Sequence, residues 1–134
     1  MISEIEIKDA LYAMLVDSPL VGAVSGRLYK DSRPKNSVKE DVVISISSSM
    51  VGQIQRFRAN VNIYVPDSRR EEEYIENTKR LRVLSALAAE TLEHFGNGAF
   101  QLDMESQRCI DVEDINFHCI NNRLKIRAVN FFTK

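Results

Sequence analysis

The residues that could act as nucleophiles are few and lack the neighbours that would activate them. Serines occupy positions 47–49, but no glycine elbow surrounds them and no histidine lies at a recognisable offset. Cys109, Cys119, His94 and His118 are the only cysteines and histidines of the sequence, which is too small a set for a structural zinc site. Free cysteines of this kind are usually core residues. We therefore expect both thiols to be structural and predict no catalytic nucleophile.

Two groups of carboxylates have a spacing that could bind a divalent cation. Asp103 and Glu105 are two positions apart, so a strand would place both on one face. Asp111, Glu113 and Asp114 flank an expected turn. Carboxylate oxygens suit magnesium or calcium, yet acidic residues on edge strands also discourage aggregation, and we favour that interpretation. The scattered glycines form no phosphate-binding loop, so we expect no metal, no cofactor and no enzymatic activity.

Basic residues gather first in a polar segment that runs from Lys30 to Asp41. Arg33, Lys35 and Lys39 lie in it, and the segment reads as an exposed loop that is longer than usual. Long loops often carry binding residues. Two interpretations of this loop remain open: an arm that contacts another protein, and a mobile connector without a partner. In the first, Arg33, Lys35 and Lys39 are the candidate protein-contact residues.

A second basic cluster surrounds the strand expected after this loop. It contains Arg56, Arg58, Arg69 and Arg70, and the acidic residues at 71–73 follow it closely. Only Tyr64 supplies an aromatic side chain on the same face, and the net charge of the chain is -1, so we do not expect nucleic acid as a partner. We interpret Arg56 and Arg58 as further candidates for a protein contact, with a plain solvated face as the alternative.

The size of the chain and its N-terminus restrict the class of protein. A length of 134 residues predicts a single domain over 1–134 that can bury a core without disulfide or metal. The first eight residues have no basic segment followed by an apolar one, so we expect no signal peptide. No apolar run approaches the ~20 residues that cross a bilayer. These features predict a cytosolic protein without membrane contact.

The central elements are an alternating strand and a long amphipathic segment. From Phe57 to Val65 apolar and polar residues alternate, which predicts a strand with one packed face and one wet face. We expect a helix from Ser68 to Phe95, capped by Ser68 with Glu71 at capping-box spacing and ended by the residues at 96–98. Its expected inward stripe consists of Tyr74, Thr78, Leu81, Leu84, Ala88, Leu92 and Phe95, widened by Leu87 and Thr91, with Lys79, Arg80 and Arg82 outward.

The other elements complete a small mixed fold. An N-terminal helix is expected over 3–16, with Ser3 and Glu6 at capping-box spacing and a stop at Pro19. Asn121 and Asn122 have the composition of a two-residue hairpin turn. The expected strands cover 42–48, 53–65, 100–109, 112–120 and 123–132, with a short extended segment at 27–30. This order predicts an α+β fold: a mainly antiparallel sheet with two helices packed on one face.

The order of elements resembles the tail-terminator, or tail-completion, family of tailed bacteriophages and prophages. The resemblance covers most of the chain and depends on helix stops and strand starts rather than on reactive residues. It is carried by a helix ending near Ser18-Pro19-Leu20-Val21, the segment Gly26-Arg27-Leu28-Tyr29, Arg33-Pro34 in a polar loop, and Glu40-Asp41-Val42-Val43-Ile44 at a strand start.

The resemblance implies a structural virion protein rather than an enzyme. Members of the family form a homohexameric ring that ends the tail tube and offers a surface to the head connector. This implies self-association, contacts with tube and connector proteins, and a location in the host cytoplasm during assembly and in the virion tail afterwards. Two alternatives remain open: a neck or head-completion protein, and a small ligand-binding α+β domain without catalysis.

Overall fold

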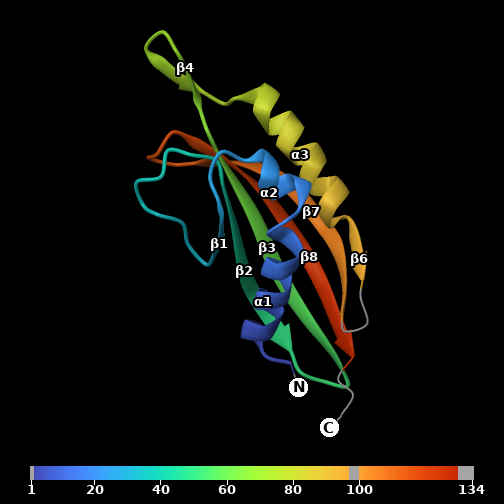
Figure 1. Cartoon of the computed structure of the whole chain (residues 1–134). Coiled ribbons are helices and arrows are strands. Elements are labelled where there is room, and N and C mark those ends of the chain that lie inside the picture. The colour runs from blue at the N-terminus through green and yellow to red at the C-terminus, as the bar shows by residue number, and fades with distance from the viewer. Residues whose placement is uncertain (1, 97–99, 130–134) are drawn as a thin grey trace.

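Helices cover one face of the sheet and leave most of the other face bare (Figure 1). The computed structural model describes residues 2–96 and 100–129. Within these residues, six strands form one sheet in the order β1-β2-β3-β8-β7-β6, and β4 pairs with β5 in a separate hairpin. β1 runs parallel to β2, and the other neighbours are antiparallel. The mainly antiparallel α+β fold is therefore confirmed.

The elements occur along the chain in the following order. They are α1 (Glu4–Leu15), α2 (Pro19–Ala23), β1 (Leu28–Lys30), β2 (Asp41–Met50), β3 (Ile54–Pro66), β4 (Ser68–Arg70), β5 (Glu73–Ile75), α3 (Thr78–Leu92), β6 (His94–Gly96), β7 (Phe100–Val112) and β8 (Phe117–Val129).

The first helix forms as its sequence predicts. The Ser3 hydroxyl accepts a hydrogen bond from the Glu6 backbone N–H, and the Glu6 side chain accepts one from the Ser3 N–H, which completes the capping box. Ile7, Leu11 and Leu15 are buried against the sheet. A second short helix, α2, which the sequence did not predict, begins at Pro19. Proline is favoured at the first position of a helix, where its missing N–H costs nothing.

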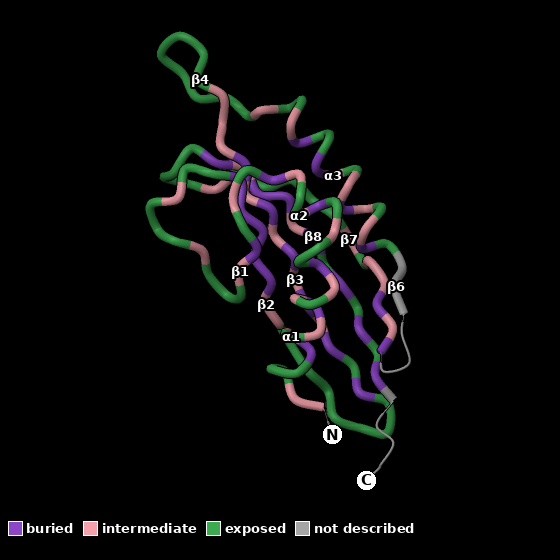
Figure 2. Tube along the Cα trace, viewed as in Figure 1, coloured by how far each residue is buried: buried purple, intermediate pink, exposed green. Residues whose placement is uncertain are grey.

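The alternating strand packs as predicted. β3 buries every second side chain on the helix-covered face, namely Phe57, Ala59, Val61, Ile63 and Val65 (Figure 2). The intervening residues lie on the opposite face. β2 pairs with β3 in antiparallel register and buries Val42 and Ile44 beside it. A shift of one residue would turn the arginines of β3 into the core, so the alternation determines the register.

The predicted helix over 68–95 is wrong in its first third. Residues 68–75 form the hairpin β4–β5, which projects from the body (Figure 1), and α3 begins at Thr78. The Asn77 side chain accepts from the Arg80 backbone N–H, so Asn77 and not Ser68 caps the helix. Leu81, Leu84, Ala88 and Leu92 are buried as expected, Leu87 packs partly against them, and Tyr74 and Thr78 are exposed. A helix started at Ser68 would carry no core-facing leucine in its first three turns, so packing could not support it.

The end of α3 and its outward side also differ from the prediction. The helix ends at Leu92, and His94–Gly96 form β6 beside β7. The expected stop falls partly on residues 97 and 98, which lie outside the described residues, as does the side chain of Phe95. Lys79 and Arg82 are exposed as expected, whereas Arg80 turns inward toward Glu40.

The two last strands replace three shorter predicted ones. β7 and β8 are continuous strands of 13 residues each, and Asn121 and Asn122 lie in the middle of β8. The predicted hairpin there is wrong. The turn between β7 and β8 instead contains Asp114 and Asn116, with φ of 70° and 57°. Asp and Asn tolerate this left-handed region better than other non-glycine residues. The predicted strand beyond Val129 lies outside the described residues.

Gly26, just before β1, packs closely against the backbone just before β2. Its backbone N–H donates to the Glu40 carbonyl at 2.7 Å. A Cβ at this position would lie 1.9 Å from Asp41 Oδ1 and 2.4 Å from the Glu40 carbonyl oxygen. No side chain fits such an approach, so glycine is required at this point of the chain.

Candidate interaction surfaces

The loop over 31–40 folds back onto the sheet through Arg33. The Arg33 guanidinium donates to Asp41 Oδ2 at 3.1 Å, and these two side chains are only 10% and 1% exposed. It also lies 4.4 Å from the ring centroids of both Tyr64 and Phe117, where cation–π attraction adds to the ion pair. Burial raises the pKa of Tyr64, and the nearby Arg33 charge opposes this shift.

Asp41 holds the base of this loop at several points. Its carboxylate accepts from the Arg27 backbone N–H at 3.1 Å and from the Ser37 hydroxyl at 2.5 Å, in addition to Arg33. A buried carboxylate needs such partners because its desolvation is costly. The loop is therefore tied down, and Arg33 is engaged within the fold. Lys35 and Lys39, the two other candidates in this loop, remain exposed to solvent.

The bare face of the sheet carries two adjacent rows of cations. Arg56 of β3 lies directly opposite Arg127 of β8, and Arg58 lies opposite Lys125. Arg123 continues the row along β8. Like charges directly opposite each other on neighbouring strands are destabilising unless a counter-charge is near. We call the set Arg56, Arg58, Arg123, Lys125 and Arg127 the basic face.

β7 supplies part of the counter-charge to the basic face. Glu105 accepts from Arg58 Nε at 3.0 Å, and Gln101 accepts from Arg127 at 2.7 Å. Asp103 lies opposite Lys125 in the pairing of β7 with β8. The two carboxylates predicted to share a face thus lie beside cations. Five basic residues and two acidic ones leave this area positive. A hollow of about 340 Å³ opens between them, lined by Arg56, Arg58, Asp103, Lys125, Ile126 and Arg127.

The sequence predicted two of the five residues of the basic face. Arg56 and Arg58 were predicted as contact residues, whereas Arg123, Lys125 and Arg127 were not. Their signal was present, because basic residues alternate with Leu124, Ile126 and Ala128, which are buried. The structure separates the predicted candidates: Arg56 and Arg58 join the basic face, while Lys35 and Lys39 belong to the loop over 31–40.

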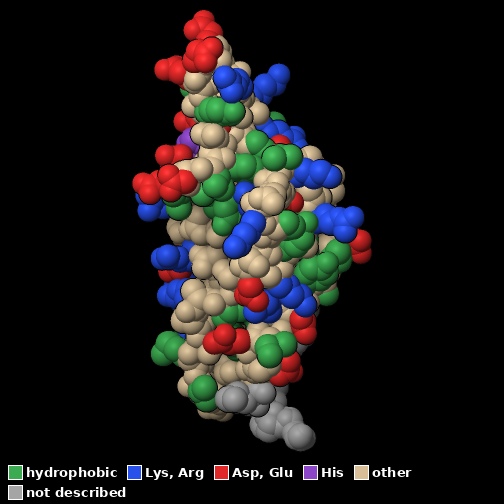
Figure 3. All heavy atoms as spheres, turned by 90° about the vertical axis from the view of Figure 1, so that its left-hand side faces the viewer, with side chains coloured by type: hydrophobic (Ala, Val, Ile, Leu, Met, Phe, Trp, Pro, Cys, Tyr) green, Lys and Arg blue, Asp and Glu red, His purple; other side chains and the backbone are tan. Residues whose placement is uncertain are grey.

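The hairpin β4–β5 is an exposed arm that ends in carboxylates. All residues from Arg69 to Glu76 are exposed (Figure 2), and red acidic side chains gather at this projecting end in Figure 3. Arg69 folds along the hairpin: it donates to the Tyr74 hydroxyl at 3.1 Å and lies 3.8 Å from the Glu72 carboxylate. Tyr74 and Ile75 are nevertheless 47% and 38% exposed, so the arm offers apolar as well as acidic groups.

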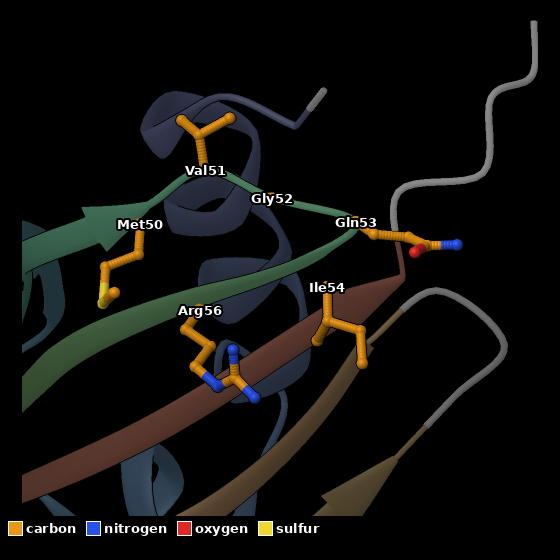
Figure 4. Close-up of a pocket in the computed structure, with 6 residues that line it drawn as sticks. All are labelled: Met50, Val51, Gly52, Gln53, Ile54 and Arg56. Atoms are coloured by element: carbon orange, nitrogen blue, oxygen red, sulfur yellow. The ribbon is translucent and has the colours of Figure 1, made fainter.

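A second apolar feature lies at the opposite end of the molecule, at the turn between β2 and β3 (Figures 1 and 4). Met50, Val51 and Ile54 are 63%, 72% and 43% exposed there. They line a hollow of about 580 Å³ together with Gly52, Gln53 and Arg56. Figure 4 shows that Met50, Ile54 and Arg56 point to the same side of the ribbon. We call this feature the turn hollow; it adjoins the basic face through Arg56.

The structure also pairs His118 with Asp67, a contact that the sequence did not indicate. His118 Nδ1 lies 2.7 Å from Asp67 Oδ1. A hollow of about 330 Å³ beside them is lined by Asp67, Tyr74, Asp111, Val112, Glu113, Asp114, Asn116 and His118. This lining contains no serine, threonine or cysteine that the pair could activate. The Asp67 backbone also donates to the Asn116 carbonyl, so the pair ties the end of β3 to the start of β8.

The remaining candidates for chemistry lie apart from one another. Cys119 is buried as expected and Cys109 is exposed, contrary to expectation. Cys109 pairs with Ile120 and Cys119 with Ile110 on neighbouring strands, so the two thiols point to opposite faces. Among residues 2–96 and 100–129, no group of three or more histidine, cysteine or acidic side chains could hold a metal ion.

No protein-family model matches the chain, and no curated protein matches it. In the described part of the chain, none of the helices combines the length and apolar character needed to cross a membrane.

Proposed function

We propose that this chain is a structural protein of the phage tail-terminator type, which assembles into a homohexameric ring, ends the tail tube and joins it to the head connector. It would act without catalysis in the host cytoplasm during assembly and remain in the virion tail. The observation that carries the proposal is the basic face. Opposed pairs such as Arg56 with Arg127 are unfavourable in an isolated sheet, which favours a surface that a protein partner covers.

Two further features agree with an assembly role. The fold has a projecting arm at one end and an apolar hollow at the other. Two different surfaces at opposite ends suit head-to-tail contacts between copies. Such contacts form a ring when the rotation from one copy to the next brings the last copy back to the first. The resemblance of Gly26-Arg27-Leu28-Tyr29 and its neighbouring segments to the tail-terminator family supplies the particular class of assembly.

The test measures assembly of the purified chain alone and with a tail-tube protein. Mass photometry and negative-stain electron microscopy should reveal rings, or rings seated on tube ends with tube lengths no longer increasing. A chain that stays monomeric in both conditions would overturn the proposal. A monomer that becomes a ring only on tubes would agree with it. Binding to a portal complex and not to tubes would assign the chain to the neck instead.

A further inference from the structure

We propose that the hairpin β4–β5 of one copy docks on the turn hollow and basic face of the next copy. This inference rests on the proposed self-assembly and specifies the contact that would build it. The two surfaces are on opposite ends of one chain, so the contact is heterologous and each copy offers both halves of it.

The hairpin has the properties of a segment that needs a partner. A two-stranded hairpin alone is only marginally stable in water, and β4–β5 forms its own sheet apart from the main one. Its exposed Tyr74 and Ile75 are consecutive on β5, so each face of the hairpin carries one of these two apolar side chains. Tyrosine is enriched at the centres of protein interfaces because it combines a large apolar area with a hydroxyl. An arm of this composition favours binding to another protein surface.

The charges of the two surfaces are complementary. The hairpin and the residue that follows it present Glu71, Glu72, Glu73 and Glu76 beside Arg69 and Arg70, all exposed, so acidic side chains exceed basic ones by two. The basic face presents five cations beside two carboxylates of β7. Carboxylates placed near Arg56 and Arg127 would relieve the repulsion between these two opposed cations. Opposite potentials of this kind determine which surfaces meet and in what register.

The apolar groups are complementary in the same arrangement. The turn hollow exposes Met50, Val51 and Ile54 next to Arg56 (Figure 4), while the hairpin exposes Tyr74 and Ile75 next to its glutamates. Methionine adapts its shape to a bound aromatic ring. An apolar centre surrounded by charged groups is the usual composition of a protein interface. Both halves of the proposed contact therefore have an apolar part and a charged part side by side.

Charge reversal with compensation tests the contact. One variant carries Glu71→Lys, Glu72→Lys and Glu73→Lys, and the other carries Arg56→Glu and Arg127→Glu. We expect each alone to raise the concentration for half-assembly by more than about tenfold, because like charges then meet at the interface. An equimolar mixture should assemble again, since each variant restores both contacts of the other. A single chain with all five changes should also assemble. Circular dichroism verifies that every variant is folded.

A photo-crosslinking residue in place of Tyr74 gives an independent readout. Crosslinked peptides from the assembled protein should map to residues 50–56 or 123–127 of a neighbouring copy. The same residue in place of Lys35 on the loop over 31–40 is the matched control and should not yield these peptides. Crosslinks from position 74 to any other region of a neighbouring copy would overturn the inference, whereas crosslinks within one chain to Arg69 or to the residues beside His118 are expected in either case.

The outcomes separate this inference from the proposed function. Rings that form and end tubes while both reversals leave them unchanged would overturn the docking contact and leave the tail-terminator function standing. Assembly that is lost in each variant but not regained in the mixture or the five-change chain would also overturn it. A strict monomer, with and without tubes, would contradict both proposals. A labelled single-stranded 20-mer that binds the wild type but not the Arg56→Glu/Arg127→Glu variant, with assembly unchanged, would assign the face to nucleic acid and overturn the inference.

Discussion

Arg80 of α3 forms a two-pronged contact with Glu40 at the end of the loop before β2. Its Nε donates to Glu40 Oε2 at 2.6 Å, and a terminal nitrogen donates to Oε1 at 2.9 Å. The same terminal nitrogen reaches the Ala23 carbonyl at the end of α2. One side chain thus ties together α3, α2 and the entrance to β2, and its hydrogen bond to Glu40 raises the pKa of Arg80 further.

Replacement of Arg80 by alanine should destabilise the fold. The change leaves the largely buried Glu40 carboxylate without this charged partner, and we expect a loss of about 1–3 kcal/mol in the free energy of unfolding. Urea unfolding followed by circular dichroism measures it. Arg80→Lys should recover only part of the loss, because a lysine cannot reproduce the planar fork. Arg82→Ala, on the exposed side of the same helix, is the control and should change stability by less than about 0.5 kcal/mol.

Substitution of Gly26 by alanine should cost more than its small volume suggests. The added Cβ would meet Asp41 Oδ1 and the Glu40 carbonyl oxygen at distances that no real contact adopts. The backbone between β1 and β2 must then shift, and overpacking of this kind costs about 1–3 kcal/mol. Gly22→Ala offers a matched control, because nothing lies within 4 Å of a Cβ at that position in α2. It should be neutral or slightly stabilising. Equal losses in the two variants would contradict the close approach at Gly26.

Asn122 should be a stability determinant and not a turn residue. Its side chain is fully buried, donates to the Val61 carbonyl at 3.0 Å and accepts from Gln107 at 2.8 Å. We expect Asn122→Ala to lower the free energy of unfolding by about 1–3 kcal/mol, because buried polar partners are left unpaired. A double-mutant cycle with Gln107→Ala measures the direct coupling. Full additivity of the two changes would show that the Gln107 contact contributes nothing.

The same residue shows where local sequence information ends. A pair of asparagines is a good signal for a hairpin turn, but their amides can equally bond to neighbouring strands. Asn121 donates to Asn60 and Asn62, about 60 positions away in the chain. Which use applies depends on the pairing of β3 with β8, which no local pattern reveals. The Phe57–Val65 strand was predicted correctly because its buried side chains recur at every second residue, a pattern visible in the sequence of the strand alone.

The basic face depends on the same long-range pairing. Within each strand, the alternation of basic and apolar residues predicts one row of cations. Only the pairing register of β3 with β8 places Arg56 opposite Arg127 and Arg58 opposite Lys125. The arm at β4–β5 was missed for a different reason. Ser68 and the glutamates after it have the spacing of a helix start. A helix there would have no row of apolar side chains facing the core before Leu81, so it does not form. Tertiary packing therefore determined both features.

The two thiols should differ strongly in reactivity. Burial raises the pKa of Cys119 to about 12, so almost no thiolate is present at pH 8, and thiolate is the reacting form. Cys109 is exposed, although partial burial and the nearby carboxylates Glu76 and Asp67 raise its pKa as well. With Ellman's reagent we expect one slow but measurable equivalent in the native protein and two in denaturant. Cys109→Ser should abolish the native reaction. Native modification of Cys119 at the rate of Cys109 would contradict its burial.

The raised pKa of Cys119 also predicts how stability varies in alkaline solution. The folded thiol keeps its proton up to about pH 12, whereas the unfolded thiol ionises near its ordinary value of 9.0. Between these values the unfolded state binds fewer protons, so the free energy of unfolding falls as pH rises, and below this window Cys119 contributes no slope. Tyr64, whose pKa burial also raises, adds a slope of the same sign at higher pH. Cys119→Ala should therefore flatten the decline above pH 9 without removing it, as urea unfolding at stepped pH would measure. An unchanged slope would mean that the thiol ionises equally in both states.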